Sequence, residues 1–150
     1  MSIKRLFLLA ILTFSMTTVF SQNRIDTVDM KLFWLESVEP LIQKDTTQLK
    51  SIIEFPLGGE WGFIMGLEKD EKDWSQADFL KNYDKLFRPE IISLLKKLNY
   101  HDAEIYKPND NLTEILVGIG WEEDGFEKGI VFRYKRINGV WKLYVIQAVG

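Results

Sequence analysis

The dipeptide Asn138-Gly139 restricts the fold of this chain more than any other local feature. Both residues tolerate a positive φ, which a two-residue type I′ hairpin turn requires. We therefore predict a β-hairpin in which Ile137 lies opposite Val140. Because side chains alternate between the two faces of a strand, this register also assigns the pairs on one face. They are Phe132 with Val145, Tyr134 with Leu143, and Arg136 with Trp141.

A second two-residue turn, Asp124-Gly125, predicts the preceding hairpin independently. It places Val117 opposite Phe132 and Ile119 opposite Ile130. The two turns assign the same face of the middle strand to the interior, and a shift of one residue would break that agreement. We therefore predict a three-stranded antiparallel meander over residues 112–149. Its buried face consists of Ile115, Val117, Ile119, Trp121, Ile130, Phe132, Tyr134, Trp141, Leu143 and Val145.

The opposite face of the meander is mixed in character. Lys135 lies opposite Lys142, and two like charges face each other on a sheet only where water reaches both of them. The glycines at positions 118 and 120 would allow another surface to approach closely. We therefore expect this outer face to support a homodimer interface. Its apolar members are Leu116, Val131, Tyr144 and Ile146.

Helical spacing of apolar residues begins well before the meander. Such residues recur at helical intervals from Met30 to Ile42, which predicts an amphipathic helix. Pro40 interrupts this helix because proline has no backbone N–H to donate. We expect a kink at this point, or a second helix that begins near Glu39.

A shorter helix is predicted next, with Asp45 as its N-cap and Gln48 at the third helical position. It should stop at Phe55, because the residue that precedes a proline disfavours helix. Residues 55–59 are expected to form a loop or an irregular edge. Alternating apolar residues then predict a strand over 61–67.

Two further helices and one strand complete the predicted elements. Ser75 and Asp78 resemble a capping box at the start of one helix, and Pro89 suits the first position of the next. Residues 100–106 are predicted to form a strand whose register the sequence leaves open. The fold class is therefore α+β, with N-terminal helices packed on a curved antiparallel sheet that ends in the meander.

The N-terminus has the layout of a secretory signal peptide. Lys4 and Arg5 precede an apolar run over residues 6–20, which is shorter than the roughly 20 residues of a membrane span. We expect cleavage between Ser21 and Gln22, and an uncleaved signal anchor is the alternative. The predicted organisation is a signal peptide over residues 1–21 and a single domain over 22–150, located in the periplasm or outside the cell.

Composition excludes several classes of function. The chain has no cysteine, which rules out disulfides and a lipid-anchored cysteine. Removal of the signal would change the formal charge from −3 to −5, because the signal holds two cations and no acid. An acidic domain is poorly suited to nucleic acid or to an anionic membrane surface. With one histidine in the chain we expect neither a histidine-rich metal site nor a cofactor.

The order of predicted elements resembles the nuclear transport factor two-like superfamily, also called the cystatin-like cone. The resemblance spans Met30 to Val149, and it rests on the passage from Asp45 to Pro56-Leu57 and on the terminal hairpin with Val140-Trp141-Lys142-Leu143. The chain is similar in particular to exported Bacteroidetes-type members. The resemblance implies a sheet that wraps the helices into a cone with an open mouth. It leaves function open, because relatives include isomerases, dehydratases and non-catalytic binding or dimerising modules.

The candidate catalytic residues are His101, Asp102 and Glu104, which lie close together in the sequence. If their strand points into the mouth of the cone, an apolar environment would raise the pKa of a carboxylate and suit it to act as a base. The alternative is an exposed edge strand without catalytic activity. The aspartate and tyrosine of the steroid-isomerase branch have no residue-by-residue match here, so the resemblance assigns no catalytic residue.

Four residues are candidates for ligand binding: Trp61, Tyr106, Tyr134 and Arg136. Arg136, opposite Trp141, is either a clamp for a ligand carboxylate or a guanidinium stacked on an indole, and stacking is the expected arrangement. Most tryptophans fall on buried faces by spacing, which leaves Trp61 and Trp74 as the exposed candidates.

The leading hypothesis is an exported, non-catalytic module that binds a small apolar ligand or a protein. One alternative is an isomerase-like or dehydratase-like enzyme that uses an acid or base in the cone. Another is an inhibitor or immunity-type module, which would present an exposed patch over residues 55–61 instead of a pocket.

Overall fold

The computed structural model describes residues 30–59 and 73–149. The chain divides into the units Met1–Leu32 and Phe33–Gly150, and the elements described below belong to the second. The signal peptide, the strand expected over 61–67 and Trp61 lie outside the described residues. The elements are η1 (Trp34–Val38), α2 (Glu39–Gln43), α3 (Thr46–Ile52), β1 (Ile53–Gly59), α5 (Gln76–Leu86), α6 (Pro89–Lys96), β2 (Glu104–Asn109), β3 (Leu112–Glu123), β4 (Phe126–Ile137) and β5 (Val140–Val149).

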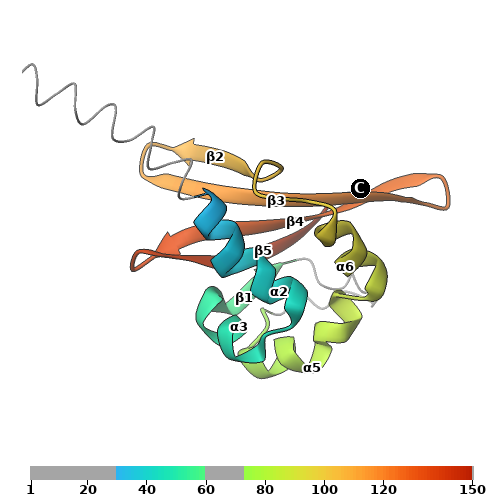
Figure 1. The fold of residues 1–150 in the computed structure, drawn as a ribbon, viewed down its shortest axis with the longest axis horizontal. Coiled ribbons are helices and arrows are strands. Elements are labelled where there is room, and N and C mark those ends of the chain that lie inside the picture. The colour runs from blue at the N-terminus through green and yellow to red at the C-terminus, as the bar shows by residue number, and fades with distance from the viewer. Residues whose placement is uncertain (1–29, 60–72, 150) are drawn as a thin grey trace, which may run out of the picture. The chain divides into compact units, whose positions relative to one another are not determined.

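The strands form one five-stranded sheet in the order β1-β5-β4-β3-β2. The described helices gather on one side of it, so the sheet has an inner face packed on helices and an outer face that none of these helices covers (Figure 1). The predicted α+β class is therefore confirmed. The sheet is mixed rather than wholly antiparallel, because β1 runs parallel to β5.

Both tight turns set the predicted registers. Ile137 pairs with Val140 across Asn138-Gly139, whose φ values are 52° and 80°. On the other hairpin, Val117 pairs with Phe132 and Ile119 with Ile130, as predicted. Most of the predicted inner face is buried, and Phe132, Tyr134 and Leu143 are no more than 1% exposed. Trp121 and Trp141 are only half-buried, because they lie at the margins of this core.

A β-bulge in β5 corrects one part of the prediction. The register between β4 and β5 shifts between Arg133 and Tyr134, so Phe132 pairs with Ile146 and not with Val145. Ile146 is therefore fully buried, while Val145 is half-buried. The prediction failed here because a turn determines pairing only as far as the first extra residue in either strand.

The helix that contains Pro40 changes type before the proline. The backbone N–H of Glu39 donates to the carbonyl of Trp34, five residues earlier, which makes Trp34–Val38 a π-helical turn. Pro40 then occupies the first turn of α2, where a missing N–H leaves no helical bond unmade. The predicted second helix beginning near Glu39 is confirmed.

Residues 55–59, expected to form a loop or an irregular edge, are part of an edge strand whose pairing is irregular. Asp45 caps α3 as predicted, accepting hydrogen bonds from the N–H groups of Thr47 and Gln48, but α3 ends at Ile52. β1 follows directly and pairs with β5, with Ile53 opposite Leu143. Pro56 is compatible with a strand here because β1 lies at the edge of the sheet.

The helical layer supplies an aromatic core. The predicted capping box of Ser75 and Asp78 is present at the start of α5. Phe87 stacks between Tyr83 and Phe132, at ring-centroid distances of 4.7 Å and 5.8 Å. The Tyr83 hydroxyl donates to the carbonyl of Leu41, which ties α5 to α2. Trp74, expected to be exposed, is 4% exposed because its backbone pairs with Leu57 and draws the indole into this layer.

The strand predicted over residues 100–106 begins later. Residues 100–103 form a turn, and β2 runs over Glu104–Asn109 with all six residues exposed. The turn is held by the Asp102 carboxylate, which accepts the N–H of Asn99 at 2.8 Å, and by the Asn99 side chain, which accepts the N–H of His101 at 2.9 Å. These side-chain bonds to the backbone compete with strand pairing.

Candidate functional site

The three candidate catalytic residues lie at the surface. His101 and Asp102 are exposed in the turn before β2, and Glu104 is exposed at the first position of that strand. The Asp102 carboxylate caps the turn, and the His101 ring lies against Tyr100 at 3.9 Å between centroids. The apolar surroundings on which the acid–base hypothesis depends are therefore absent around these side chains.

The candidate ligand-binding residues are not brought together. Tyr134 is on the inner face and 1% exposed, with its ring edge against Phe33 at 4.9 Å. Arg136 lies over the ring of Trp141 at 5.1 Å, which is the stacked arrangement expected from the sequence. Tyr106 is 43% exposed on β2. It pairs with Glu114 and so belongs to the outer face.

The inner-face residues leave two polar atoms without a hydrogen bond. The Tyr134 hydroxyl and the Trp141 indole N–H are buried and have no hydrogen-bond partner. Burial alone raises the pKa of Tyr134 far above its ordinary value, so this phenol stays protonated. Its position beneath Phe33 leaves it out of contact with solvent, which makes Tyr134 a core residue rather than an accessible ligand group.

The outer face holds a buried carboxylate that the sequence reasoning missed. Glu114 on β3 is 1% exposed although no described helix covers it. Its Oε2 accepts hydrogen bonds from Nε and Nη2 of Arg133, at 3.0 and 2.7 Å. Its Oε1 accepts the hydroxyl of Tyr144, at 2.7 Å. Both oxygens are therefore engaged, as a buried charge requires.

Neighbouring side chains on three strands account for this burial. Glu114 pairs with Tyr106 on β2 and with Lys135 on β4. The Lys135 ammonium lies 4.5 Å from the centroid of the Tyr144 ring, and Arg133 lies 5.9 Å from it. The side chains of Arg133, Lys135 and Tyr144 thus surround the carboxylate on this face of the sheet.

The hydrogen bonds of Glu114 alter the acidity of its partners. The bond from Arg133 raises the pKa of that guanidinium. Burial, followed by the bond to Glu114, raises the pKa of Tyr144 to about 12. Both shifts favour the protonated donor beside a carboxylate. We call Glu114, Arg133, Lys135 and Tyr144 the outer-face cluster.

Part of this cluster is readable from the sequence. The register set by Asp124-Gly125 places Glu114 directly opposite Lys135, a pair of opposite charges. The burial of Glu114 could not be predicted in the same way. It depends on the register of β2, which places Tyr106 opposite Glu114 and which the sequence leaves open. The predicted dimer face also changes: Leu116, Val131 and Tyr144 are half-buried on it, but Ile146 is in the core.

A groove lies between α6 and the end of β3. Its volume is about 630 Å³. The apolar part consists of Ile91, which is 1% exposed, and of the half-buried Leu94 and Trp121. Arg88 lies over the Trp121 ring at 5.9 Å. The lining residues are Arg88, Glu90, Ile91, Ser93, Leu94, Lys97, Trp121, Glu122 and Glu123.

Charges of both signs border the groove. Arg88 approaches Glu90 at 3.8 Å, while Glu123 is held by Lys128 at 2.7 Å. Hydrogen bonds from Lys128 and Trp121 hold the pKa of Glu123 below its ordinary value. The carboxylate of Glu123 is therefore already paired. The guanidinium of Arg88 has only a long ion pair with Glu90, so it can still bind an anionic group of a ligand.

The predicted patch over residues 55–61 receives limited support within the described residues. Phe55 is half-buried with its ring 6.0 Å from that of Phe79, and Leu57 is fully buried. The apolar side chains of this stretch of β1 therefore serve the core. The remaining two residues of the patch lie outside the described part of the chain.

No group of three or more histidine, cysteine or acidic side chains within residues 30–59 and 73–149 is placed to hold a metal ion. None of the helices in those ranges has the length and hydropathy of a membrane span.

Comparisons with known proteins give no assignment. No protein-family model matches the chain, and no curated protein matches it.

Proposed function

We propose that this chain is an exported, non-catalytic binding protein that takes a small ligand in the groove between α6 and β3. The observation that carries the proposal is the groove itself, about 630 Å³ in volume with a half-buried tryptophan in its wall. Pockets for small ligands have volumes of roughly 300–1,000 Å³ and combine an apolar lining with a few polar groups.

The lining favours a ligand with a flat apolar body and one acidic group. Leu94 and Trp121 offer apolar surface to the body. Arg88, stacked near the indole, offers a planar donor fork to a carboxylate or sulfonate. A ligand with a second negative charge is disfavoured, because Glu122 and Glu123 border the same groove.

Export and family membership are further parts of this proposal. The basic start, apolar run and short residues before Gln22 support a cleaved signal peptide. The order of elements, with helices and one strand followed by more helices and a meander, supports the nuclear transport factor two-like resemblance. Binding without catalysis is common in that superfamily, so the fold is compatible with the proposed role.

The test uses 8-anilinonaphthalene-1-sulfonate, an apolar aromatic probe with one sulfonate. We expect saturable binding with enhanced, blue-shifted emission. Leu94→Glu should weaken binding at least tenfold, because it adds charge to the apolar wall beside two acidic residues, and Arg88→Gln should weaken it about fivefold.

The matched control is Ile105→Glu, which alters an apolar side chain on β2 that is 43% exposed and does not line the groove. It should leave the affinity unchanged. Equal affinity in all variants, with unchanged circular dichroism, would contradict the assignment of the ligand to this groove.

A further inference from the structure

We propose that the outer face of the sheet around Arg133 and Lys135 binds an acidic, extended segment of another protein. This proposal goes beyond the small-ligand groove and does not depend on it. It begins from the outer-face cluster, where a nearly fully buried carboxylate holds an arginine in one orientation.

Arg133 is oriented for a second anion. Its Nε and Nη2 atoms donate to one oxygen of Glu114, at 3.0 and 2.7 Å. A guanidinium has five N–H donors in a planar fork, so Nη1 and the second hydrogen of Nη2 point away from Glu114. The side chain is 29% exposed, which leaves this end of the fork accessible for a two-pronged contact with a carboxylate.

Among the described residues, Lys135 makes no ion pair of its own. Lys135 lies directly opposite Lys142 on β5, and like charges in that position destabilise a sheet. Lys142 is already paired with Glu54, at 3.4 Å between the ammonium nitrogen and a carboxylate oxygen. Lys135 rests over the Tyr144 ring, and the one carboxylate it pairs with across the strands, Glu114, already has both oxygens engaged. An added carboxylate would therefore give Lys135 the partner that it lacks.

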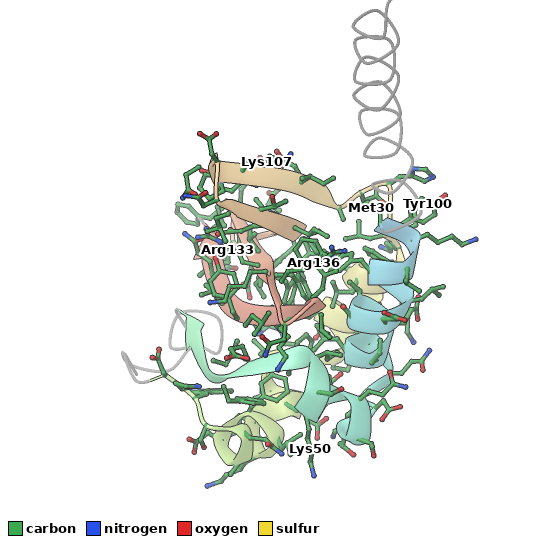
Figure 2. All side chains as sticks on the ribbon, turned by 90° about the vertical axis from the view of Figure 1, so that its left-hand side faces the viewer. Met30, Lys50, Tyr100, Lys107, Arg133 and Arg136 are labelled. Atoms are coloured by element: carbon green, nitrogen blue, oxygen red, sulfur yellow. The ribbon has the colours of Figure 1, made fainter. Side chains whose placement is uncertain are left out.

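The spacing of the cations fits an extended peptide. Arg133 and Lys135 are two residues apart on β4, so their side chains leave the same face about 7 Å apart. An extended segment presents alternate side chains at the same interval, which allows two acidic residues to meet both cations. The half-buried Leu116 and Val131 lie on this face and offer apolar contact to the segment. Figure 2 shows Arg133 on the side of β4 away from Arg136 and the helices.

Charge favours such a segment over a second copy of this chain. A two-fold interface brings the same surface of each copy together. Arg133, Lys135 and Lys142 would then all lie within one interface, and those near the two-fold axis would face their own equivalents, where like charges oppose association. An acidic segment brings only carboxylates to Arg133 and Lys135, so it avoids this repulsion.

The experiment titrates the purified protein with a fluorescently labelled peptide of alternating glutamate and valine, and measures anisotropy at low and high salt. The matched peptide has glutamine in place of glutamate. We expect the acidic peptide to bind, more weakly at high salt, and the glutamine peptide not to bind. Lys135→Gln should weaken binding about fivefold, and Arg133→Lys about tenfold because the fork is lost.

The control variant is Lys81→Gln, which removes an exposed cation from α5 and should leave the affinity unchanged. Lys135→Gln keeps the test decisive if Arg133→Lys does not fold. The proposal is overturned if neither peptide binds, if both bind equally, or if Lys81→Gln and Lys135→Gln weaken binding alike. It is also overturned if an oligogalacturonate binds more tightly than the acidic peptide, or if light scattering shows a dimer that Lys135→Glu dissociates.

Discussion

The hydroxyl of Tyr144 donates a 2.7 Å hydrogen bond to Oε1 of Glu114, across the strand that separates them in the sheet. With the two bonds from Arg133, this contact satisfies a carboxylate that is 1% exposed on the face that no described helix covers. A polar interaction of this kind usually occurs beneath a second layer. Here the side chains of the sheet form that layer themselves.

Glu114→Gln should destabilise the protein by about 2 kcal/mol, because it removes the negative charge from a bonded, largely desolvated pair and leaves Arg133 without its partner. The free energy of unfolding in urea measures the effect. Glu104→Gln is the matched control: it changes an exposed carboxylate on the neighbouring strand and should alter stability by less than about 0.5 kcal/mol. Equal effects of the two substitutions would contradict the role given to Glu114.

Tyr134→Phe and Tyr83→Phe should have opposite effects. Tyr134 buries a hydroxyl without a hydrogen bond, so its removal should stabilise the protein by about 1 kcal/mol. Tyr83 donates to the Leu41 carbonyl, so its removal should destabilise the protein by about 1 kcal/mol. Thermal and urea unfolding of the two variants supply the measurement. A loss of stability in Tyr134→Phe would show that its hydroxyl has a partner.

Stability should fall as the pH rises above about 10. Burial raises the pKa of Tyr83, Tyr134 and Tyr144 in the folded protein, that of Tyr144 to about 12. A raised pKa adds stability below the unfolded value of about 10, and that stability is lost as the pH approaches the folded value. Between these limits the unfolded chain binds fewer protons, so the slope of unfolding free energy against pH is negative. Tyr144→Phe should make the slope between pH 10 and about 12 shallower.

Gly59→Ala should be severely destabilising. Gly59 has a φ of +150°, and a Cβ built on it would lie 2.1 Å from the carbonyl oxygen of Ile146. We expect a loss of about 3 kcal/mol or more, because both the backbone conformation and the pairing of β1 with β5 would have to change. Gly118→Ala is the control, since nothing lies within 4 Å of its added Cβ. Guanidinium unfolding of both variants should separate them clearly.

Cleavage between Ser21 and Gln22 can be checked by the mass of the exported product. Expression of the whole chain in a Gram-negative host should release a soluble periplasmic protein that begins at Gln22. Intact-mass measurement and N-terminal sequencing identify that residue. Recovery of the full-length chain in the membrane fraction would favour the signal-anchor alternative instead.

Local chemistry made the meander and the helix starts predictable. Asn138-Gly139 and Asp124-Gly125 each determine the geometry of one turn. The registers of the two hairpins then agree on which face of β4 points inward. Ser75, Asp45 and Pro89 act on the first turn of their own helices, so neighbouring residues suffice to predict them. No distant contact was needed at any of these positions.

The missed features depend on contacts between distant parts of the chain. Ile53–Gly59 becomes a strand because β5 offers it an edge, which no nearby residue indicates. The bulge that buries Ile146 is set by packing across the sheet rather than by the turn. The groove needs α6 and the end of β3 together, and the burial of Glu114 needs three strands.

The pairing of Ile53 with Leu143 also has a kinetic consequence. β1 is synthesised well before β5, because α5, α6 and the strands β2 to β4 lie between them in the chain. This long-range pairing raises the contact order, so the edge of the sheet forms late. A nascent chain that lacks β5 leaves β1 without its partner strand, so β1 stays unpaired until β5 has been synthesised. Such a delay suits the proposed export, because an unfolded chain is the form that a secretion channel can thread.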